Sequence, residues 1–237
     1  GVSRTGLLPV PHRWPHGPVA LDHHPPPAGT TLREQVRAFR AATAGARLRG
    51  GDARDVVDAM RPYTQAIWKG LSPDDQRRFL RSYTRFWAIN RNRMAPAADD
   101  WVQSLRRDGR LTIVTGSVAG AEEADGRLRV GIRRSGQTAI ETFDVDAAIN
   151  CVGPADSPFG VGSPLYDRLL AEGLARPDPL GLGLETGAGG AVRDAAGALS
   201  PALFTIGWMR RGELWESVAI PELRDQSAEL AARITAS

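Results

Sequence analysis

Leu203–Gly207 (LFTIG), followed after a short polar loop by Gly212–Arg224 (GELWESVAIPELR), is the stretch that decides the fold of this chain. The first segment predicts a short buried strand that stops at a glycine, and the second predicts a tight loop and a helix. The first amides of a helix have no intrahelical partner. A helix that begins at the end of a sheet therefore offers an anion site.

A second apolar run, Ala147–Val152, also stops at a glycine, Gly153. A nearly continuous apolar run is expected of a strand buried on both faces, and Cys151 within it is expected to be a buried structural thiol. Two strands that stop at glycine are typical of the edge of a dinucleotide-binding sheet, so we expect both in one sheet. The usual opening signature of such a sheet, G-x-G-x-x-G, is absent from the 237 residues.

The composition argues against several classes of protein. Basic residues number 30 against 27 acidic ones, but no basic run is interleaved with aromatics, so we expect no nucleic-acid partner. The single Cys151 excludes an internal disulfide and a cysteine-based zinc site. No apolar run reaches the roughly 18 residues of a transmembrane helix, and no signal peptide is visible, so we expect no membrane association and a cytoplasmic protein.

Three regions follow along the chain. Residues 1–30 form a proline-rich extended segment that holds all four histidines. A metal site there is the functional interpretation. A solvated loop is the simpler one, and we prefer it because no nearby Cys or Glu completes a ligand set. The histidines are His12, His16, His23 and His24.

Residues 31–110 are expected to be helical. Thr31–Glu34 has the sequence of a capping box, and Ser72–Asp75 places a capping serine before a proline at the first helical position. The aromatic stripe of the following helix is interpreted as core rather than as a cofactor site.

At the start of residues 111–237 the apolar residues begin to alternate with polar ones, with a period of two. Residues 111–114, 128–132 and 138–143 predict three short strands of a small antiparallel meander. A short helix is expected around 165–170, a loop with a hairpin over 181–200, and then the closing strand and helix. In FAD domains of flavoproteins, the last elements of the chain follow in this order. We therefore predict an α/β fold that is the back half of a Rossmann-like FAD/NAD(P)-binding fold, with an inserted helical region and a small β-meander.

Several segments carry a resemblance to a known family. The chain resembles the C-terminal two-thirds of bacterial FAD/NAD(P)-binding oxidoreductases, which are distantly similar to flavin-dependent N-hydroxylating monooxygenases. The resemblance implies that the family's two glycine motifs, for FAD and for the nicotinamide cofactor, would precede Gly1. The matching segments are 3–9 (SRTGLLP) with His12, Trp68 with Leu71, 79–94, 149–154 (INCVGP) and 204–226.

One departure from the family pattern affects the site. The family shows Arg-His-Arg where this chain has Arg91-Asn92-Arg93, which puts in doubt an acid–base role carried over to this position. On an extended segment Arg91 and Arg93 would face the same side and could clamp a phosphate or a carboxylate. The alternative is a cationic helix end that interacts with the helix dipole.

The resemblance also implies cofactor contacts at the N-terminus. Ser3 and Arg4 would end the second strand of a nicotinamide-cofactor half, where the arginine fork suits the 2′-phosphate of NADP. A capped turn with a solvated arginine is the other interpretation. NAD and NADP are not distinguished by these residues.

The remaining candidates lie at the two glycine-terminated strands. Gly153 with Pro154, and Gly207, are expected to let the backbone approach the cofactor, although ordinary turn glycines would look the same. In related flavoproteins the first amides of the closing helix face the pyrimidine edge of the flavin and stabilise its anionic reduced form. That resemblance assigns a flavin-facing role to Gly212, Trp215, Glu216 and Ser217, with simple packing as the alternative for Trp215.

The function expected from these residues is an FAD-dependent oxidoreductase that uses NAD(P)H, with monooxygenase-like chemistry as one form of it, present here as an incomplete chain. The alternative is a non-catalytic fragment or interaction module that binds no cofactor. Because the pyrophosphate normally lies on the absent glycine loop, we expect this chain alone to bind FAD weakly or not at all. The substrate, the catalytic residues and the oligomeric state do not follow from the sequence.

Overall fold

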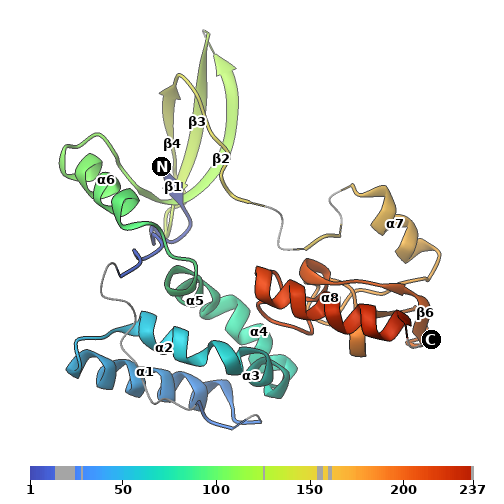
Figure 1. The fold of residues 1–237 in the computed structure, drawn as a ribbon. Helices are drawn as coiled ribbons and strands as arrows, with labels where there is room; N and C mark the ends of the chain where they lie inside the picture. Colours follow the sequence, from blue (N-terminus) through green and yellow to red (C-terminus); the bar gives the residue numbers. More distant parts are fainter. Residues whose placement is uncertain (14–24, 28, 125, 154–156, 160–161, 236–237) are drawn as a thin grey trace. The chain divides into compact units, whose positions relative to one another are not determined.

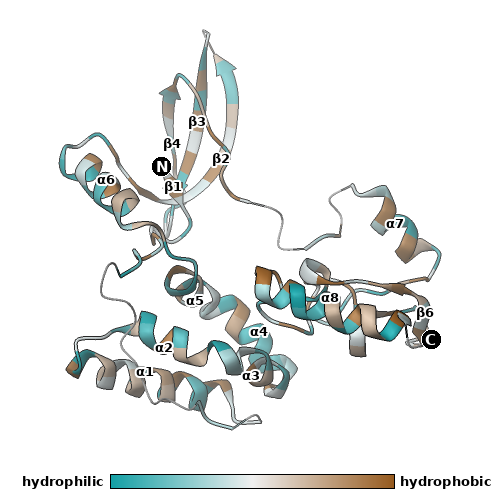
Figure 2. Cartoon of the chain, viewed as in Figure 1, coloured by the Kyte–Doolittle hydropathy of each residue, from teal (hydrophilic) through white to brown (hydrophobic). Residues whose placement is uncertain are grey.

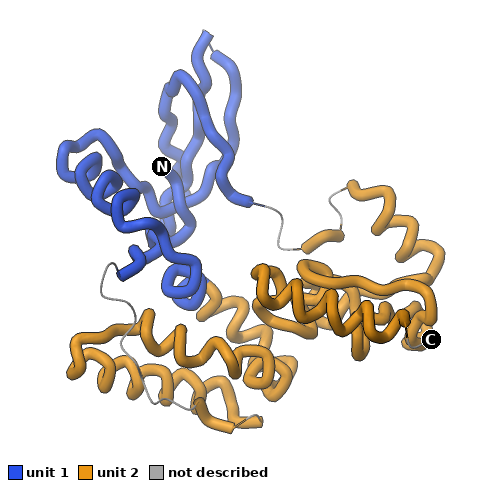
Figure 3. Tube along the Cα trace, viewed as in Figure 1, with its two compact units in different colours: residues 1–18, 85–153 blue, residues 19–84, 154–237 orange. Residues whose placement is uncertain are grey.

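The computed structural model describes all residues except 14–24, 28, 125, 154–156, 160–161 and 236–237. The chain divides into two compact units, which are described separately (Figure 3). The first unit comprises residues 1–18 and 85–153, and the second comprises residues 19–84 and 154–237.

The first unit is built around a four-stranded mixed sheet of order β1-β2-β3-β4 (Figure 1). β1 pairs parallel with the start of β2, and the other neighbours are antiparallel. The predicted meander of three antiparallel strands is confirmed, but its first strand begins at Val114, where the predicted strand 111–114 ends. Its elements are β1 (Val2–Ser3), α5 (Thr84–Arg91), α6 (Pro96–Arg107), β2 (Val114–Ala124), β3 (Arg127–Arg134) and β4 (Ile140–Val145).

Alternating side chains of the meander form a small apolar cluster. Val114, Val130 and Ile132 are buried, and Leu128 and Val145 pack against them. Bands of both hydropathy classes along β2, β3 and β4 follow from this alternation (Figure 2). The sheet thus has one face that buries apolar residues and one that does not.

The second unit combines helices from the middle of the chain with the C-terminal segment. The predicted capping box at Thr31–Glu34 is present. The Thr31 hydroxyl oxygen accepts a hydrogen bond from Glu34 N–H, and the Glu34 carboxylate accepts one from Thr31 N–H. The elements are α1 (Leu32–Leu48), α2 (Ala53–Met60), η1 (Arg61–Tyr63), α3 (Thr64–Gly70), α4 (Pro73–Ser82), α7 (Pro164–Ala171), η2 (Ala188–Gly190), β5 (Ala191–Arg193), β6 (Leu199–Phe204), η3 (Gly207–Arg210) and α8 (Ile220–Thr235).

Aromatic packing joins these two parts of the second unit. The ring of Trp68, in α3, stacks on Trp215 with centroids 5.0 Å apart, and Phe79 meets both rings edge-on. Trp68 Nε1 also donates a hydrogen bond of 2.8 Å to the carbonyl of Gly212. Leu182 completes the cluster from the C-terminal part. Phe79 and Tyr83 of the predicted aromatic stripe pack against this cluster, but Phe86 of the same stripe is 59% exposed, so the expectation of core is confirmed only in part.

Two expectations about the sheet are wrong. Residues 147–153 form no strand: Ile149 is 87% exposed, Val152 is 85% exposed, and Cys151 is exposed rather than buried. The closing strand, β6, pairs antiparallel with β5 in a separate two-stranded sheet. A strand needs a neighbour for its backbone groups, and the described residues place none beside 147–153. An apolar composition alone therefore does not make this run a buried strand.

Replacing Trp68 by alanine tests the importance of the aromatic cluster. We expect Trp68→Ala to lower the free energy of unfolding by about 3–5 kcal/mol, because it removes a buried ring and its hydrogen bond. The control is Leu48→Ala in α1, whose side chain is 91% exposed and should change stability by less than about 0.5 kcal/mol. Urea unfolding of both variants measures the difference, and equal losses would contradict the assignment.

Candidate functional site

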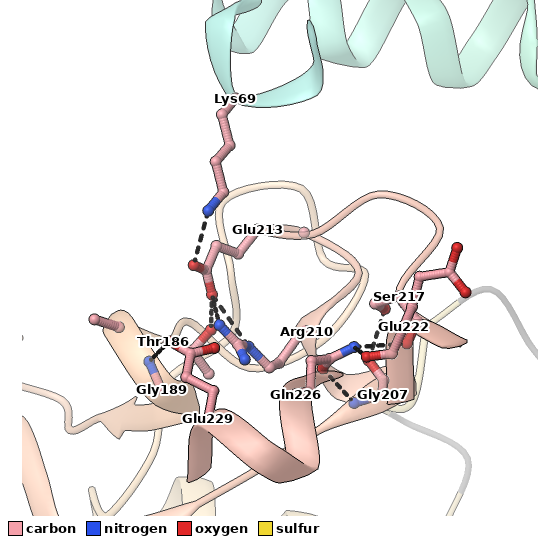
Figure 4. A network of polar contacts seen from close by, with 12 residues as sticks. Lys69, Thr186, Gly189, Gly207, Arg210, Glu213, Ser217, Glu222, Gln226 and Glu229 are labelled. Carbon is pink, nitrogen blue, oxygen red and sulfur yellow. Dashed lines mark hydrogen bonds and ion pairs between the residues drawn. The ribbon is translucent and has the colours of Figure 1, made fainter. Parts of the chain in front are cut away.

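The region predicted to face a flavin is a strand–turn–helix unit at the end of the chain. The side-chain amide of Gln226, in α8, accepts from Gly207 N–H at 2.9 Å and donates to the carbonyl of Ser217 at 2.9 Å. The Ser217 hydroxyl in turn donates to the carbonyl of Gly207 at 2.8 Å. All three residues are buried. These bonds fix the end of β6, the turn and the helix relative to one another (Figure 4).

The two predicted glycines of this unit lie against other side chains. Gly207 has a φ of +70°, which favours glycine, and a Cβ there would lie 2.8 Å from Leu223 Cδ2. A Cβ on Gly212 would overlap the carboxylate of Asp178. Internal packing and backbone conformation therefore account for both glycines.

Trp215 belongs to the aromatic core, since only 6% of it is exposed. Its Nε1 is buried and has no hydrogen-bond partner among the described residues. This placement agrees with the packing alternative left open by the sequence, and it makes Trp215 a support for the turn that follows.

Glu216, between these buried residues, has a φ of +65° and is the one non-glycine residue with positive φ in the described part of the chain. This conformation costs about 1–2 kcal/mol for an ordinary residue. Beside the strained turn, at the N-terminus of α8, Val218 is 44% exposed and Ile220 is 83% exposed. Ile206, which precedes Gly207, is 36% exposed. Three exposed or partly exposed apolar residues therefore lie in the segments next to this turn and to the start of α8.

The other predicted site residues that the structure describes lie in the first unit. Ser3 Oγ accepts hydrogen bonds from the amides of Thr5 and Gly6 at 3.4 and 3.2 Å, so Ser3 caps the turn that follows β1. Arg4 lies in this turn, at the carboxyl end of a strand in a parallel pair. Gly153 has a φ of +74°, and Pro154 lies outside the described residues.

Arg91 and Arg93 do not lie on one extended segment, which was the premise of the clamp interpretation. Arg91 is the last residue of α5, and Arg93 follows the bend that ends this helix. Arg93 Nε donates a hydrogen bond of 2.8 Å to the carbonyl of Asn90. This contact matches the alternative in which the arginines stabilise the C-terminal end of a helix.

The structure thus brings together Gly207 and Ser217 by a direct hydrogen bond, and Gly212 and Trp215 through their common contact with Trp68. The sequence did not identify a polar cavity of about 400 Å³ that lies beside them in the same unit. One face of α8 forms a wall of this cavity, because its lining residues recur three or four positions apart. The lining residues are Gln65, Lys69, Ala188, Arg210, Glu213, Leu214, Glu222, Asp225, Gln226 and Glu229.

Glu213 is the centre of the charge network at the cavity. Its Oε2 accepts from Thr186 Oγ1 at 2.6 Å and from Arg210 Nη2 at 3.0 Å, and its Oε1 lies 3.5 Å from Lys69 Nζ. The Arg210 side chain is only 3% exposed. Figure 4 shows these groups converging from α3, η3 and the loop before η2. In the sequence, the cluster of charged residues at Arg210–Glu213 between two apolar segments was the feature that could have indicated this site.

Asp178, against Gly212, is a second buried carboxylate of this region. Its Oδ1 accepts from the amide of Leu180 at 2.8 Å and its Oδ2 from the amide of Gly183 at 2.5 Å. Burial raises the pKa of Asp178 above the ordinary value of an aspartate, and the backbone hydrogen bonds only partly oppose this effect.

Comparison with family models, with curated proteins and with solved structures finds no match to this chain. Within the described residues, no helix has the length and apolarity needed to cross a membrane. The same residues contain no cluster of three or more His, Cys, Asp or Glu side chains suited to a metal ion. His16, His23 and His24 of the proline-rich segment lie outside the described residues.

Removing the Gln226 amide should destabilise the strand–turn–helix unit. Gln226→Leu keeps the approximate size but leaves the buried N–H of Gly207 and the buried carbonyl of Ser217 without partners. We expect a loss of roughly 2–4 kcal/mol in the free energy of unfolding. Ser227→Ala, an exposed neighbour on the same helix, serves as the control. A loss no larger than that of the control would show that the network does not hold this unit.

The raised pKa of Asp178 makes a prediction about pH. The folded protein binds this proton more tightly than the unfolded chain, so the resulting stabilisation is present in acid. It is lost as the pH rises from the ordinary aspartate value through the raised value of the folded state. Asp178→Asn should remove this fall. The measurement is the free energy of unfolding of wild type and variant across that pH range, and parallel curves would refute the prediction.

Proposed function

We propose that this chain is part of an FAD-dependent oxidoreductase that uses NAD(P)H. The observation that carries the proposal is the exposure of three apolar side chains, Ile206, Val218 and Ile220, in the segments next to the N-terminus of α8. A flavin ring is flat and largely apolar, and its pyrimidine edge becomes anionic on reduction. An apolar surface next to the positive end of a helix is complementary to both features.

The buried residues of the unit have a supporting role under this proposal. Gly207, Ser217 and Gln226 use their polar groups on one another, so they position the helix rather than contact a ligand. The strained backbone of Glu216 is consistent with a functional turn, because such strain concentrates at ligand-binding sites.

A bound flavin would supply the redox chemistry, by accepting a hydride from NAD(P)H and passing electrons to oxygen or another acceptor. The contribution of this chain would be orientation of the ring by the apolar side chains and electrostatic stabilisation by the helix amides. Arg4, at the carboxyl end of β1, is the candidate for a nicotinamide-cofactor phosphate.

Ile220→Glu separates this proposal from the alternative of a module that binds no cofactor. The side chain of Ile220 is 83% exposed, and an acid in the first turn of a helix is favourable, so the fold should be kept. The new charge should repel the anionic edge of a flavin and remove apolar contact. We expect weak, saturable binding of FAD to the wild-type chain, and binding about tenfold weaker for Ile220→Glu.

The measurement is flavin fluorescence during titration with protein, with ADP as a competitor that lacks the flavin ring. Ile234→Glu, at the other end of α8 and 57% exposed, is the matched control and should bind FAD like the wild type. Equal weakening of FAD binding in both variants would reject the flavin assignment.

A further inference from the structure

β4 (Ile140–Val145) is an edge strand of the four-stranded sheet in the first unit (Figure 1). Among the described residues it pairs only with β3, and no further backbone hydrogen bond involves its residues. We propose that this free edge pairs antiparallel with β4 of a second copy of the chain, so that the two meanders form one continuous sheet. This inference does not depend on the proposed flavin function.

The free edge of β4 lacks the features that usually prevent such pairing. Natural edge strands are protected by proline, lysine, a β-bulge or an unpaired charge. β4 contains no proline or lysine, and its register with β3 is unbroken from Ile140 to Val145. By contrast, the pairing of β2 with β3 shifts between Val118 and Gly120. β4 is therefore open to a neighbouring strand along its full length.

The two acidic side chains of β4 are already paired within the sheet. Glu141 Oε2 accepts from Arg134 Nη2 at 2.9 Å, and Asp144 Oδ1 accepts from Arg129 Nε at 2.9 Å. Both arginines belong to β3, on the side of β4 away from the free edge. These ion pairs offset the two negative charges and reduce the repulsion between two copies of the strand.

Exposed apolar side chains lie on both faces of β4. Phe143 is 37% exposed and lies opposite Val130, so it extends the apolar cluster of the meander to the free edge. Ile140, on the other face, is 50% exposed. Exposed apolar residues are common on surfaces, but these two lie on a strand whose backbone edge is also unpaired. A strand beside β4 would cover part of both side chains and pair the backbone.

The symmetry of two identical copies restricts the register of this pairing. A two-fold axis perpendicular to the sheet keeps the same face up in both copies, so the numbers of two opposite residues must have an even sum. Centring the pair on Glu141 or Asp144 would place that acid against its own copy, which is unfavourable. Centring it on Thr142 or Phe143 places no like charges opposite each other. Centring it near either end leaves most of the strand unpaired.

The register centred on Phe143 satisfies the edge best. It places Phe143 of one copy against Phe143 of the other, and opposite aromatic side chains stabilise an antiparallel pair. It also uses the whole strand, because Ile140 then lies opposite Asp146 of the second copy and Val145 lies opposite Glu141. The apolar clusters of the two meanders would become continuous at the Phe143 pair.

Sedimentation-velocity measurements of the full chain over a range of concentrations test the association. We expect a reversible monomer–dimer equilibrium with a dissociation constant on the order of 10 µM, since a single strand pair forms a small interface. A chain that remains monomeric up to about 0.5 mM would overturn the proposal. Open-ended association would also overturn it, because a two-fold contact closes on two copies. Sedimentation reports mass and not cofactor binding, so its outcome is independent of the flavin titration.

Charge substitutions at Ile140 test the register. Ile140→Asp places an acid opposite Asp146 on both sides of the axis, so the dimer should be at least about tenfold weaker. Ile140→Lys creates opposite-charge pairs at the same two places and should leave the dimer as strong as in the wild type or stronger. Loss of the apolar side chain affects both variants alike, so opposite effects identify the pairing. Equal effects of the two variants would refute this register.

Val118→Asp and Val118→Lys are the matched controls. Val118 is 56% exposed in β2, which is separated from the free edge by β3, so neither change should alter the dimer. Circular dichroism and the melting temperature establish that each variant is folded. A dimer weakened by Val118→Asp as much as by Ile140→Asp would refute the contact through β4.

Phe143→Glu and Phe143→Lys test the position of the axis independently. Each variant alone places like charges against each other at the axis and should dimerise at least about tenfold more weakly than the wild type. In an equimolar mixture the two variants bring opposite charges together and should associate more tightly than either does alone. A mixture that associates no better than the separate variants would refute the pairing at the axis. If loss of the ring unfolds these variants, the two Ile140 variants decide the question.

Discussion

The buried amide of Gln226 is the interaction on which the C-terminal part of the second unit depends. One side chain supplies an acceptor to Gly207 and a donor to Ser217, and the Ser217 hydroxyl closes the network on the carbonyl of Gly207. A backbone that reverses direction in a buried turn exposes amides and carbonyls that no sheet or helix satisfies. The network satisfies them and, by doing so, determines where α8 begins relative to the end of β6.

The contacts of Trp68 likewise fix two segments relative to one another, but these segments lie far apart in the sequence. They connect α3, from the middle of the chain, to the turn that contains Gly212 and Trp215. The polar cavity exists because of these contacts, since its wall combines α3 residues with those of η3 and α8. Residues separated by well over a hundred positions therefore share one site, and neither part of the chain contains that site alone.

Rigidity and strain are unevenly distributed in this region. The residues on either side of Glu216 are buried, while Glu216 itself adopts a backbone conformation that disfavours a side chain. The exposed apolar side chains lie next to this strained point rather than over the packed core. A rigid frame that holds a strained turn beside an open surface is a suitable arrangement for contact with a ligand.

The sequence by itself determined the local features: the capped helices, the meander and the closing strand and helix. These depend on short-range rules such as caps, turn glycines and periodicity, which act between residues close in the chain. It failed for 147–152, where an apolar run predicted a buried strand but the described residues provide no neighbouring strand. For Arg91 and Arg93 the sequence left two interpretations open, and the structure places these residues at the end of a helix. Only the tertiary structure showed that other side chains fill the space beside Gly207 and Gly212. It alone also showed that Lys69, Arg210 and Glu222 line one cavity. The physical reason is that burial and hydrogen-bond pairing between distant segments depend on which surfaces meet, and no local pattern in the sequence records this.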